Sequence, residues 1–346
     1  MDLLSLLAWR GSCIVNYAHA TAALKRTLTS MINPFLSHPA AILDIISRYS
    51  AVIGGEVALA FVRRPHPIQP RTLEIFASTS LYRLLCDDFM SDPRLSPDIV
   101  STISVTTHFP YNIQSDVLET MQIVLRSSRT IYIRRSSTLS PLSPIARSIC
   151  TAMVNFVTPH CFGCAYPRLT LDDKALISDS REDSMADFDA TIMRTLAMQQ
   201  IDVAVDPATW QQYRIWSPSP ANTDTAKACW RSHYICPEQG RFFGDRGSLV
   251  DFIDPLGTPP AALQKQGSPP FGTSVIWRLS SSYRCPLSCQ SHDNILLIGQ
   301  TSTAIILLDD PYANPGRERQ RGRTISRSNG NTRSMSYGLR IRSLSL

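Results

Sequence analysis

The sequence predicts a mixed protein of the α/β or α+β class, on three observations. Short strand-like runs of apolar residues are separated by segments with helical periodicity, which is typical of layered architectures. The 346 residues are 43% hydrophobic and 18% charged, as in an ordinary globular protein with a sizeable core. The 24 prolines predict long and numerous loops.

Residues 1–55 predict helices that lead into a first strand. Residues 1–36 predict one or two short helices. Residues 37–50 predict another helix, with Pro39 in its first turn and apolar side chains along one face. AVIGG, residues 51–55, predicts a short buried strand that ends in glycines.

A helix, a loop and a second strand follow. EVALAFVRR predicts the helix, and the proline-rich RPHPIQP predicts the loop. TLEIFAS then predicts a strand that places Leu73 and Ile75 on one side and Glu74 and Phe76 on the other.

Three more helices and two more strands are predicted up to residue 175. Helical periodicity covers residues 79–90, 115–125 and 143–157. TISVTTHF, residues 102–109, and TIYIRRS, residues 130–136, predict strands. We therefore expect an N-terminal helical segment over residues 1–36 and a first domain over residues 37–175.

The composition changes after residue 175. Residues 176–310 predict one helix and a small mixed region rich in Trp and Cys, with strands at SVIWRL, NILLIG and TAIILL. Residues 311–346 are rich in Arg, Ser and Gly and contain few apolar residues, so we expect a disordered basic tail.

The positive charge of the chain is concentrated in that tail. It holds eight arginines and one glutamate, a charge of +7, which leaves −1 for the other residues of a chain whose net charge is +6. A near-neutral body argues against a broad nucleic-acid-binding face, so we expect nucleic acid to bind only through the tail. The tail has three open interpretations: it binds RNA or a membrane surface, it is phosphorylated on its serines, or it has no selected role.

The sequence also predicts an intracellular protein. MDLLSLLAW lacks the basic start of a secretory signal, and no apolar run is long enough to span a bilayer, so we expect no membrane partner. The nine cysteines are odd in number and scattered, which favours reduced thiols over a disulfide framework.

The pair Gly54-Gly55 is the most informative local feature. A Gly-Gly turn between a strand and a helix lets the backbone approach a ligand closely and presents amide groups at a helix N-terminus. That arrangement suits a triphosphate. The alternative is a tight packing turn, with Glu74 as a solvated strand residue.

Gly54-Gly55, the helix EVALAFV and the strand LEIF together resemble the DNA-polymerase-β-like nucleotidyltransferase superfamily. The chain is also similar to a group of uncharacterised fungal proteins with degenerate folds of this kind, through residues 140–157, CAYPRLTL and CPEQGRFFGDRGSL. The resemblance implies a nucleotidyltransferase-like sheet with flanking helices. It also implies that Gly54, Gly55 and Glu74 form a vestigial nucleotide-binding site.

The resemblance implies three catalytic carboxylates, and two of them are missing from the expected positions. Thr72 occupies the first position, Glu74 occupies the second, and the later strands contain no Asp or Glu. We therefore expect no catalytic residues and a non-catalytic scaffold that acts in binding or interaction with a protein partner. The alternative is a Mg²⁺-dependent nucleotidyltransferase with a rearranged set, for which Asp116 and Glu119 are the nearby reserves.

The cysteines suggest a second, independent site. Cys229, Cys236, Cys285 and Cys289 lie in the loop-rich second half and are candidate zinc ligands that would stabilise an interaction module. Cys161 and Cys164 have CxxC spacing but fall at a predicted strand, where cysteines often belong to the core. In GDRGSL, residues 244–249, we expect a hairpin turn, with a ligand-binding loop as the alternative.

Overall fold

The structure is a computed structural model of the chain. It describes residues 1–64, 69–95, 98–106, 116–177, 194–214, 230–237, 239–254, 273–279, 304–307, 323–325 and 340–342. The chain divides into two compact units. Unit 1 comprises residues 1–148, 153–164 and 250–266, and unit 2 comprises residues 149–152, 165–249 and 267–346.

Unit 1 begins with three helices, α1 (Leu3–Arg10), α2 (Ile14–Ile32) and α3 (Pro39–Arg48). The side chain of Asp2 caps α1 by accepting a hydrogen bond of 2.8 Å from the amide of Ser5. Pro39 opens α3, where its missing N–H has no cost. The helices predicted in residues 1–50 are therefore confirmed, although α2, at 19 residues, is longer than expected.

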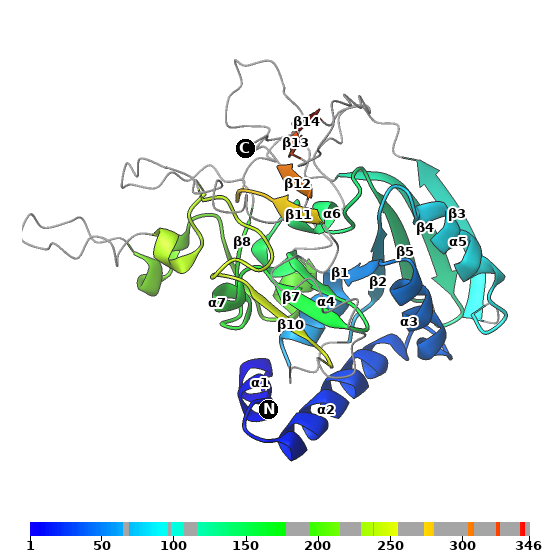
Figure 1. The fold of residues 1–346 in the computed structure, drawn as a ribbon, viewed down its shortest axis with the longest axis horizontal. Coiled ribbons are helices and arrows are strands. Elements are labelled where there is room, and N and C mark those ends of the chain that lie inside the picture. The colour runs from blue at the N-terminus through cyan, green and yellow to red at the C-terminus, as the bar shows by residue number, and fades with distance from the viewer. Residues whose placement is uncertain are drawn as a thin grey trace, which may run out of the picture. The chain divides into compact units, whose positions relative to one another are not determined.

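An eight-stranded mixed sheet forms the centre of unit 1, in the order β10-β7-β6-β1-β2-β5-β4-β3 (Figure 1). Its strands, in chain order, are β1 (Val52–Gly54), β2 (Thr72–Ala77), β3 (Ile99–Thr106), β4 (Val117–Leu125), β5 (Thr130–Ser136), β6 (Asn155–Val157), β7 (Cys161–Cys164) and β10 (Leu249–Phe252). The strands predicted at residues 51–55, 72–78 and 130–136 are confirmed, and β3 lies close to its predicted position.

The pairing of β2 with β5 is parallel, whereas β1 runs antiparallel to β2 and β4 runs antiparallel to β5. The sequence between β1 and β2 forms α4 (Gly55–Val62), the predicted helix. The side chain of Glu56 accepts hydrogen bonds from the amides of Arg71, at 2.6 Å, and Thr72, at 3.3 Å. Glu56 in the first turn of α4 thus fixes the start of β2.

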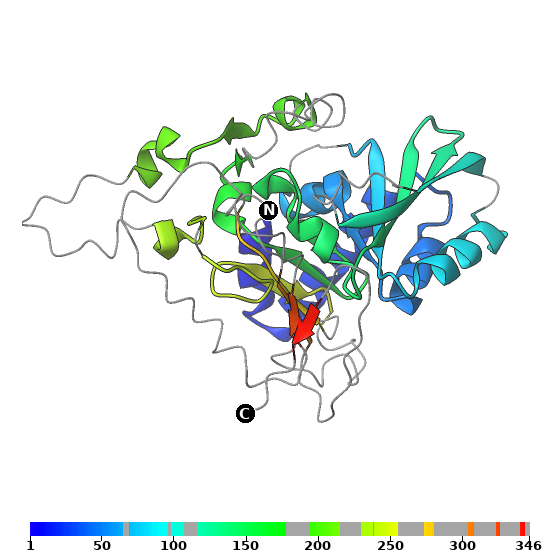
Figure 2. The same cartoon turned by 90° about the horizontal axis from the view of Figure 1, so that it is seen from above.

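One face of the sheet is apolar and lies under helices. Side chains from neighbouring strands alternate in phase, so Ile75, Ile133 and Met121 share this face and are buried. Helices α3 and α5 (Tyr82–Ser91) lie along one side of the β5-β4-β3 half (Figure 2). Helix α4 packs on β2 and β6.

The opposite face is more polar and carries Thr72, Glu74, Tyr132 and Arg134. The chain that follows β5 contains the short helix α6 (Ser143–Ala146) and a network of buried hydroxyl groups. Its shortest link, between the side chains of Thr138 and Ser143, is 2.7 Å long. The hydroxyls satisfy one another and the local backbone, so this loop is ordered by its own side chains.

The helix predicted over residues 115–125 is wrong, because this segment forms strand β4. The apolar residues of this segment fit both the helical and the strand periodicity. Residues Met121, Ile123 and Leu125 are buried in strict alternation, and β4 pairs on both sides, with β3 and β5. Pairing with two neighbouring strands decides in favour of the strand.

The helix predicted over residues 143–157 is also wrong. Only α6 is helical, and a 3-10 turn (Thr151–Met153) and strand β6 follow it. The apolar residues assigned to one helical face are buried, but in different elements. Asn155 and Phe156 pair with β7, and Val157 pairs with both β7 and β1, which requires extended backbone there.

Unit 2 contains short elements. They are α7 (Pro167–Thr170), β8 (Lys174–Leu176), β9 (Asp202–Ala204), η3 (Pro207–Thr209), η4 (Gln211–Tyr213), η5 (Trp230–His233), β11 (Thr273–Ile276), β12 (Ala304–Leu307), β13 (Arg323–Ile325) and β14 (Arg340–Arg342). The strands predicted at SVIWRL and TAIILL correspond to β11 and β12. NILLIG and most of the tail lie outside the described residues, and β13 and β14 are the described parts of that tail.

Within the described residues, no helix combines the length and the apolar character that crossing a membrane requires.

Candidate functional site

The Gly-Gly pair lies where β1 ends and α4 begins. Gly54 is the last residue of β1 and pairs with Glu74 in the neighbouring strand β2. Gly55 opens α4 with φ at +60°, a conformation that glycine adopts readily and other residues rarely adopt. The predicted strand, Gly-Gly turn and helix are therefore present, and the turn faces Glu74.

Both glycines are also required by close packing. A Cβ atom on Gly54 would lie 2.7 Å from the ring of Phe76 and 3.1 Å from Ile145. A Cβ atom on Gly55 would lie 2.9 Å from Cδ of Glu74. The glycines thus leave space for side chains of the protein itself, and the carboxylate of Glu74 fills the space beside Gly55.

Glu74 has a cationic partner on the neighbouring parallel strand. Nη2 of Arg134 lies 3.3 Å from Oε2 of Glu74, and the two side chains are 15% and 18% exposed. The guanidinium of Arg134 also lies over the rings of Tyr132, at 5.3 Å, and Phe76, at 5.8 Å. Arg134 is therefore fixed by an ion pair and two aromatic rings, and it compensates the negative charge of Glu74.

The two reserve carboxylates do not reach this cluster. Glu119 pairs in register with Arg135, so it lies on the opposite face of the sheet from Glu74, and its carboxylate is 3.6 Å from Arg135. Asp116 precedes β4 with φ at +49° and forms an ion pair of 3.0 Å with Arg147. Burial raises the pKa of Asp116, and the nearby Arg147 opposes that shift.

The sequence analysis missed Tyr132 and Arg134, and it placed Phe76 on the same side of the strand as Glu74 without assigning it to the site. Local alternation shows only that Tyr132 and Arg134 share one face of β5, as Glu74 and Phe76 share one face of β2. Only the parallel register between the two strands brings Arg134 to Glu74. That register is not written in either strand alone.

The predicted zinc site lies mostly outside the described residues. Cys229, Cys285 and Cys289 fall in undescribed segments, whereas Cys236 is described and buried. Among the residues that the structure describes, no group of three or more His, Cys, Asp or Glu side chains is placed to bind a metal ion.

Cys161 and Cys164 are core residues. Both are buried in strand β7, and their odd spacing of three places them on opposite faces of that strand. Burial raises the pKa of Cys161 to about 11, so its thiol is neutral at physiological pH.

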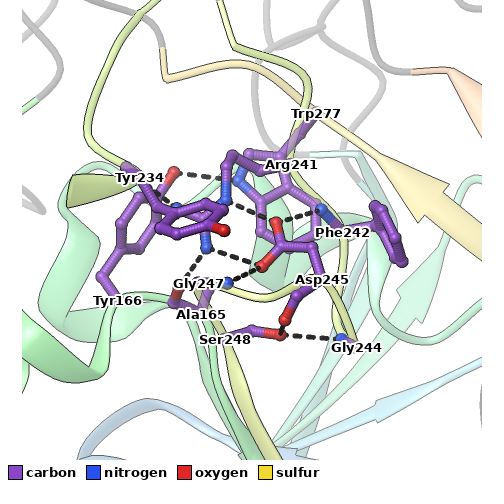
Figure 3. Close-up of polar contacts among 10 residues, drawn as sticks. All are labelled: Ala165, Tyr166, Tyr234, Arg241, Phe242, Gly244, Asp245, Gly247, Ser248 and Trp277. Atoms are coloured by element: carbon purple, nitrogen blue, oxygen red, sulfur yellow. Dashed lines mark hydrogen bonds and ion pairs between the residues drawn. The ribbon is translucent and has the colours of Figure 1, made fainter. Parts of the chain in front are cut away.

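The segment GDRGSL belongs to a polar cluster within unit 2 (Figure 3). Its centre is Arg241, whose side chain is 1% exposed, and Asp245, four residues later. The guanidinium donates to Asp245 through Nε at 2.6 Å and through Nη2 at 3.2 Å. This two-point geometry is the strongest arrangement available to an arginine and a carboxylate.

Other groups of unit 2 complete the surroundings of Arg241. Nη1 donates to the carbonyl oxygen of Tyr234, and Nη2 donates at 2.6 Å to that of Ala165. The rings of Tyr166 and Tyr234 lie 4.7 and 5.2 Å from the guanidinium carbon. Arg241 therefore joins segments that are up to 76 residues apart in the sequence.

Asp245 also organises the turn itself. Its Oδ1 accepts a hydrogen bond of 2.9 Å from the amide of Gly247, and its backbone carbonyl accepts one from the hydroxyl of Ser248 at 3.0 Å (Figure 3). The backbone of Arg241 exchanges two hydrogen bonds with Trp277. The polar groups of this segment are directed at one another, which favours a structural turn over a ligand-binding loop.

We expect the substitution Gly55→Ala to lower the free energy of unfolding by about 1–3 kcal/mol. Alanine is strained at φ of +60°, and its methyl group would displace Glu74. Urea unfolding followed by circular dichroism measures the change. The matched control is Gly11→Ala, where φ is −74° and the nearest atom to an added Cβ is 3.5 Å away, and it should change stability by about 1 kcal/mol or less. Equal effects of the two substitutions would contradict this account of Gly55.

We expect Asp245→Asn to destabilise unit 2 by about 3–5 kcal/mol, because it leaves the buried charge of Arg241 without its counter-ion. Four of the five tryptophans of the chain are in unit 2, so tryptophan fluorescence during thermal unfolding follows this unit. The control is Asp206→Asn, at an exposed carboxylate of the same unit, which should shift the transition only slightly. A transition in Asp245→Asn that coincides with that of the wild type would refute the structural role.

In comparisons with known proteins, no protein-family model, no curated protein and no solved structure matches the chain.

Proposed function

We propose that the chain is a non-catalytic, nucleotidyltransferase-like scaffold that acts in binding, with a protein as its partner. The observation that carries the proposal is the ion pair between Glu74 and Arg134. In the nucleotidyltransferase superfamily that the chain resembles, the corresponding face of the sheet would hold carboxylates for two divalent metal ions. Here one carboxylate is present, and a fixed cation lies beside it.

The charge of the cluster supports this proposal. Two divalent ions need several uncompensated carboxylates close together, because the ligands must offset four positive charges. Thr72 is neutral, Glu74 is compensated by Arg134, and Tyr132 is the residue of β5 paired with Glu74. A guanidinium 3.3 Å from Glu74 would repel an incoming divalent cation.

A metal-dependent nucleotidyltransferase with rearranged carboxylates is the alternative, and the positions of the reserve residues disfavour it. Glu119 lies on the opposite face of the sheet, and Asp116 is bound by Arg147. Both would have to leave an arginine partner, and Glu119 would also have to cross the sheet. Binding needs no such rearrangement, since tyrosine and arginine are themselves common at the centres of protein interfaces.

We expect the full 346-residue chain to show no Mg²⁺-dependent or Mn²⁺-dependent binding of ATP or GTP at concentrations up to about 1 mM. Isothermal titration calorimetry measures this, and Glu74→Ala serves as the comparison. Metal-dependent binding that disappears in Glu74→Ala would overturn the non-catalytic proposal. Binding that persists unchanged in Glu74→Ala would show a nucleotide site elsewhere, and the role of this cluster would then remain non-catalytic.

The geometry also predicts that a metal site can be installed on this face. The substitutions Thr72→Asp, Tyr132→Asp and Arg134→Ala would give three carboxylates on one face, two in β2 and one at the paired position of β5. We expect the triple variant to bind Mn²⁺ with a Kd below about 1 mM, while the wild type does not. Electron paramagnetic resonance of free Mn²⁺ measures both. The control, Arg134→Ala alone, should not bind, and failure of a folded triple variant to bind would show that these positions do not converge.

A further inference from the structure

The two outer strands of the eight-stranded sheet differ in how they are covered. At one edge, the side chain of Arg10 in α1 donates to the carbonyl oxygen of Phe252 in β10 at 2.6 Å and forms an ion pair with Asp251. Lys25 of α2 forms a second ion pair, with Asp254 just beyond β10. Charged side chains and helices thus protect this edge from strand pairing.

At the other edge, β3, the described residues provide no comparable ion pairs or helical contacts to the outer side of the strand. It is eight residues long, and β4 is its single neighbour among the strands that the structure describes. Its residues, IVSTISVT, include no charged residue and no proline, and five successive positions, residues 100–104, are exposed. An edge strand that is long, uncharged and rich in β-branched residues is a template for pairing with another strand.

Exposed apolar side chains are present on β3 and on the elements next to it. Ile103, at the centre of β3, is 52% exposed, and Val100 is 62% exposed. Leu84 and Met90 of α5 and Leu118 of β4 are exposed as well. Ile103 is in register with Gln122 and Tyr132, so it lies on the face of the sheet opposite α5, and an apolar side chain of a chain added to β3 would contact it there.

We propose that β3 pairs antiparallel with β3 of a second copy of this chain, which forms a two-fold symmetric dimer with a continuous sheet across the two copies. The absence of charge in β3 argues that the partner strand comes from a second copy of the chain. A strand that pairs with its own copy places identical side chains near one another, and any charge near its centre would oppose a like charge. In β3, residues 99–106 are all uncharged.

The geometry also predicts that assembly stops at the dimer. Among the described strands of the eight-stranded sheet, each copy has one such edge, and a two-fold pairing uses both of these edges. The backbone N–H and C=O groups on the outer side of β3 gain partners, and Ile103 gains a cross-strand neighbour on its face of the sheet. The inference concerns the edge of the sheet rather than the face around Glu74, so it stands independently of the proposed function.

Sedimentation velocity of the full chain from about 1 to 100 μM tests the proposal. The wild type should sediment as a dimer, and both Ile103→Lys and Ile103→Glu should raise the dimer Kd by about tenfold or more, because like charges meet at the centre of the pairing. An equimolar mixture of the two variants should restore the dimer, since the opposite charges attract. Circular dichroism verifies that each variant is folded.

Val15→Lys is the matched control. Val15 is 58% exposed on α2, away from β3, so the substitution adds the same charge and should leave the dimer unchanged. A monomeric wild type over this range, or a dimer that persists in both Ile103 variants, would overturn the proposal. So would larger oligomers that form regardless of residue 103, or a mixture of the two variants that stays monomeric.

Discussion

The parallel pairing of β2 with β5 is the constraint on which unit 1 depends. It fixes the phase in which side chains alternate across the centre of the sheet. With this register, Ile75 and Ile133 point to the helix-covered face, while Glu74 and Arg134 point to the other. A shift of β5 by one residue would turn Arg134 to the helix-covered face and Ile133 to the other, so the burial of one face strongly specifies the register.

The same register explains why the charge of Glu74 is compensated within the protein. Glu74 is placed beside the space left by Gly55 and within reach of Arg134. An arginine fixed by an ion pair and two rings has little freedom to move aside for another cation. The features that stabilise the cluster are thus the features that oppose a metal ion there, and this supports a binding role over catalysis.

Polar groups in the two units serve different purposes. Within unit 2, the elements are short, and the buried pair of Arg241 and Asp245 joins segments distant in the sequence, so that this cluster substitutes for long regular elements. Within unit 1, the long strands form the frame, and ion pairs such as Arg10 with Asp251 protect one edge of the sheet. The uncharged edge at β3 contrasts with that protected edge, and this contrast marks β3 as a surface for another chain.

The sequence by itself determined the elements with strong local signals. Pro39 and the apolar face of residues 37–50 specify α3, and Gly54-Gly55 specifies the turn between β1 and α4. Residues 115–125 and 143–157 were ambiguous, because their apolar residues fit more than one period, and strand pairing decided their conformation. The partner of Glu74 was likewise decided by the tertiary structure. Arg134 is 60 residues away in the sequence, and a contact of that range depends on strand order and register, which no local pattern encodes.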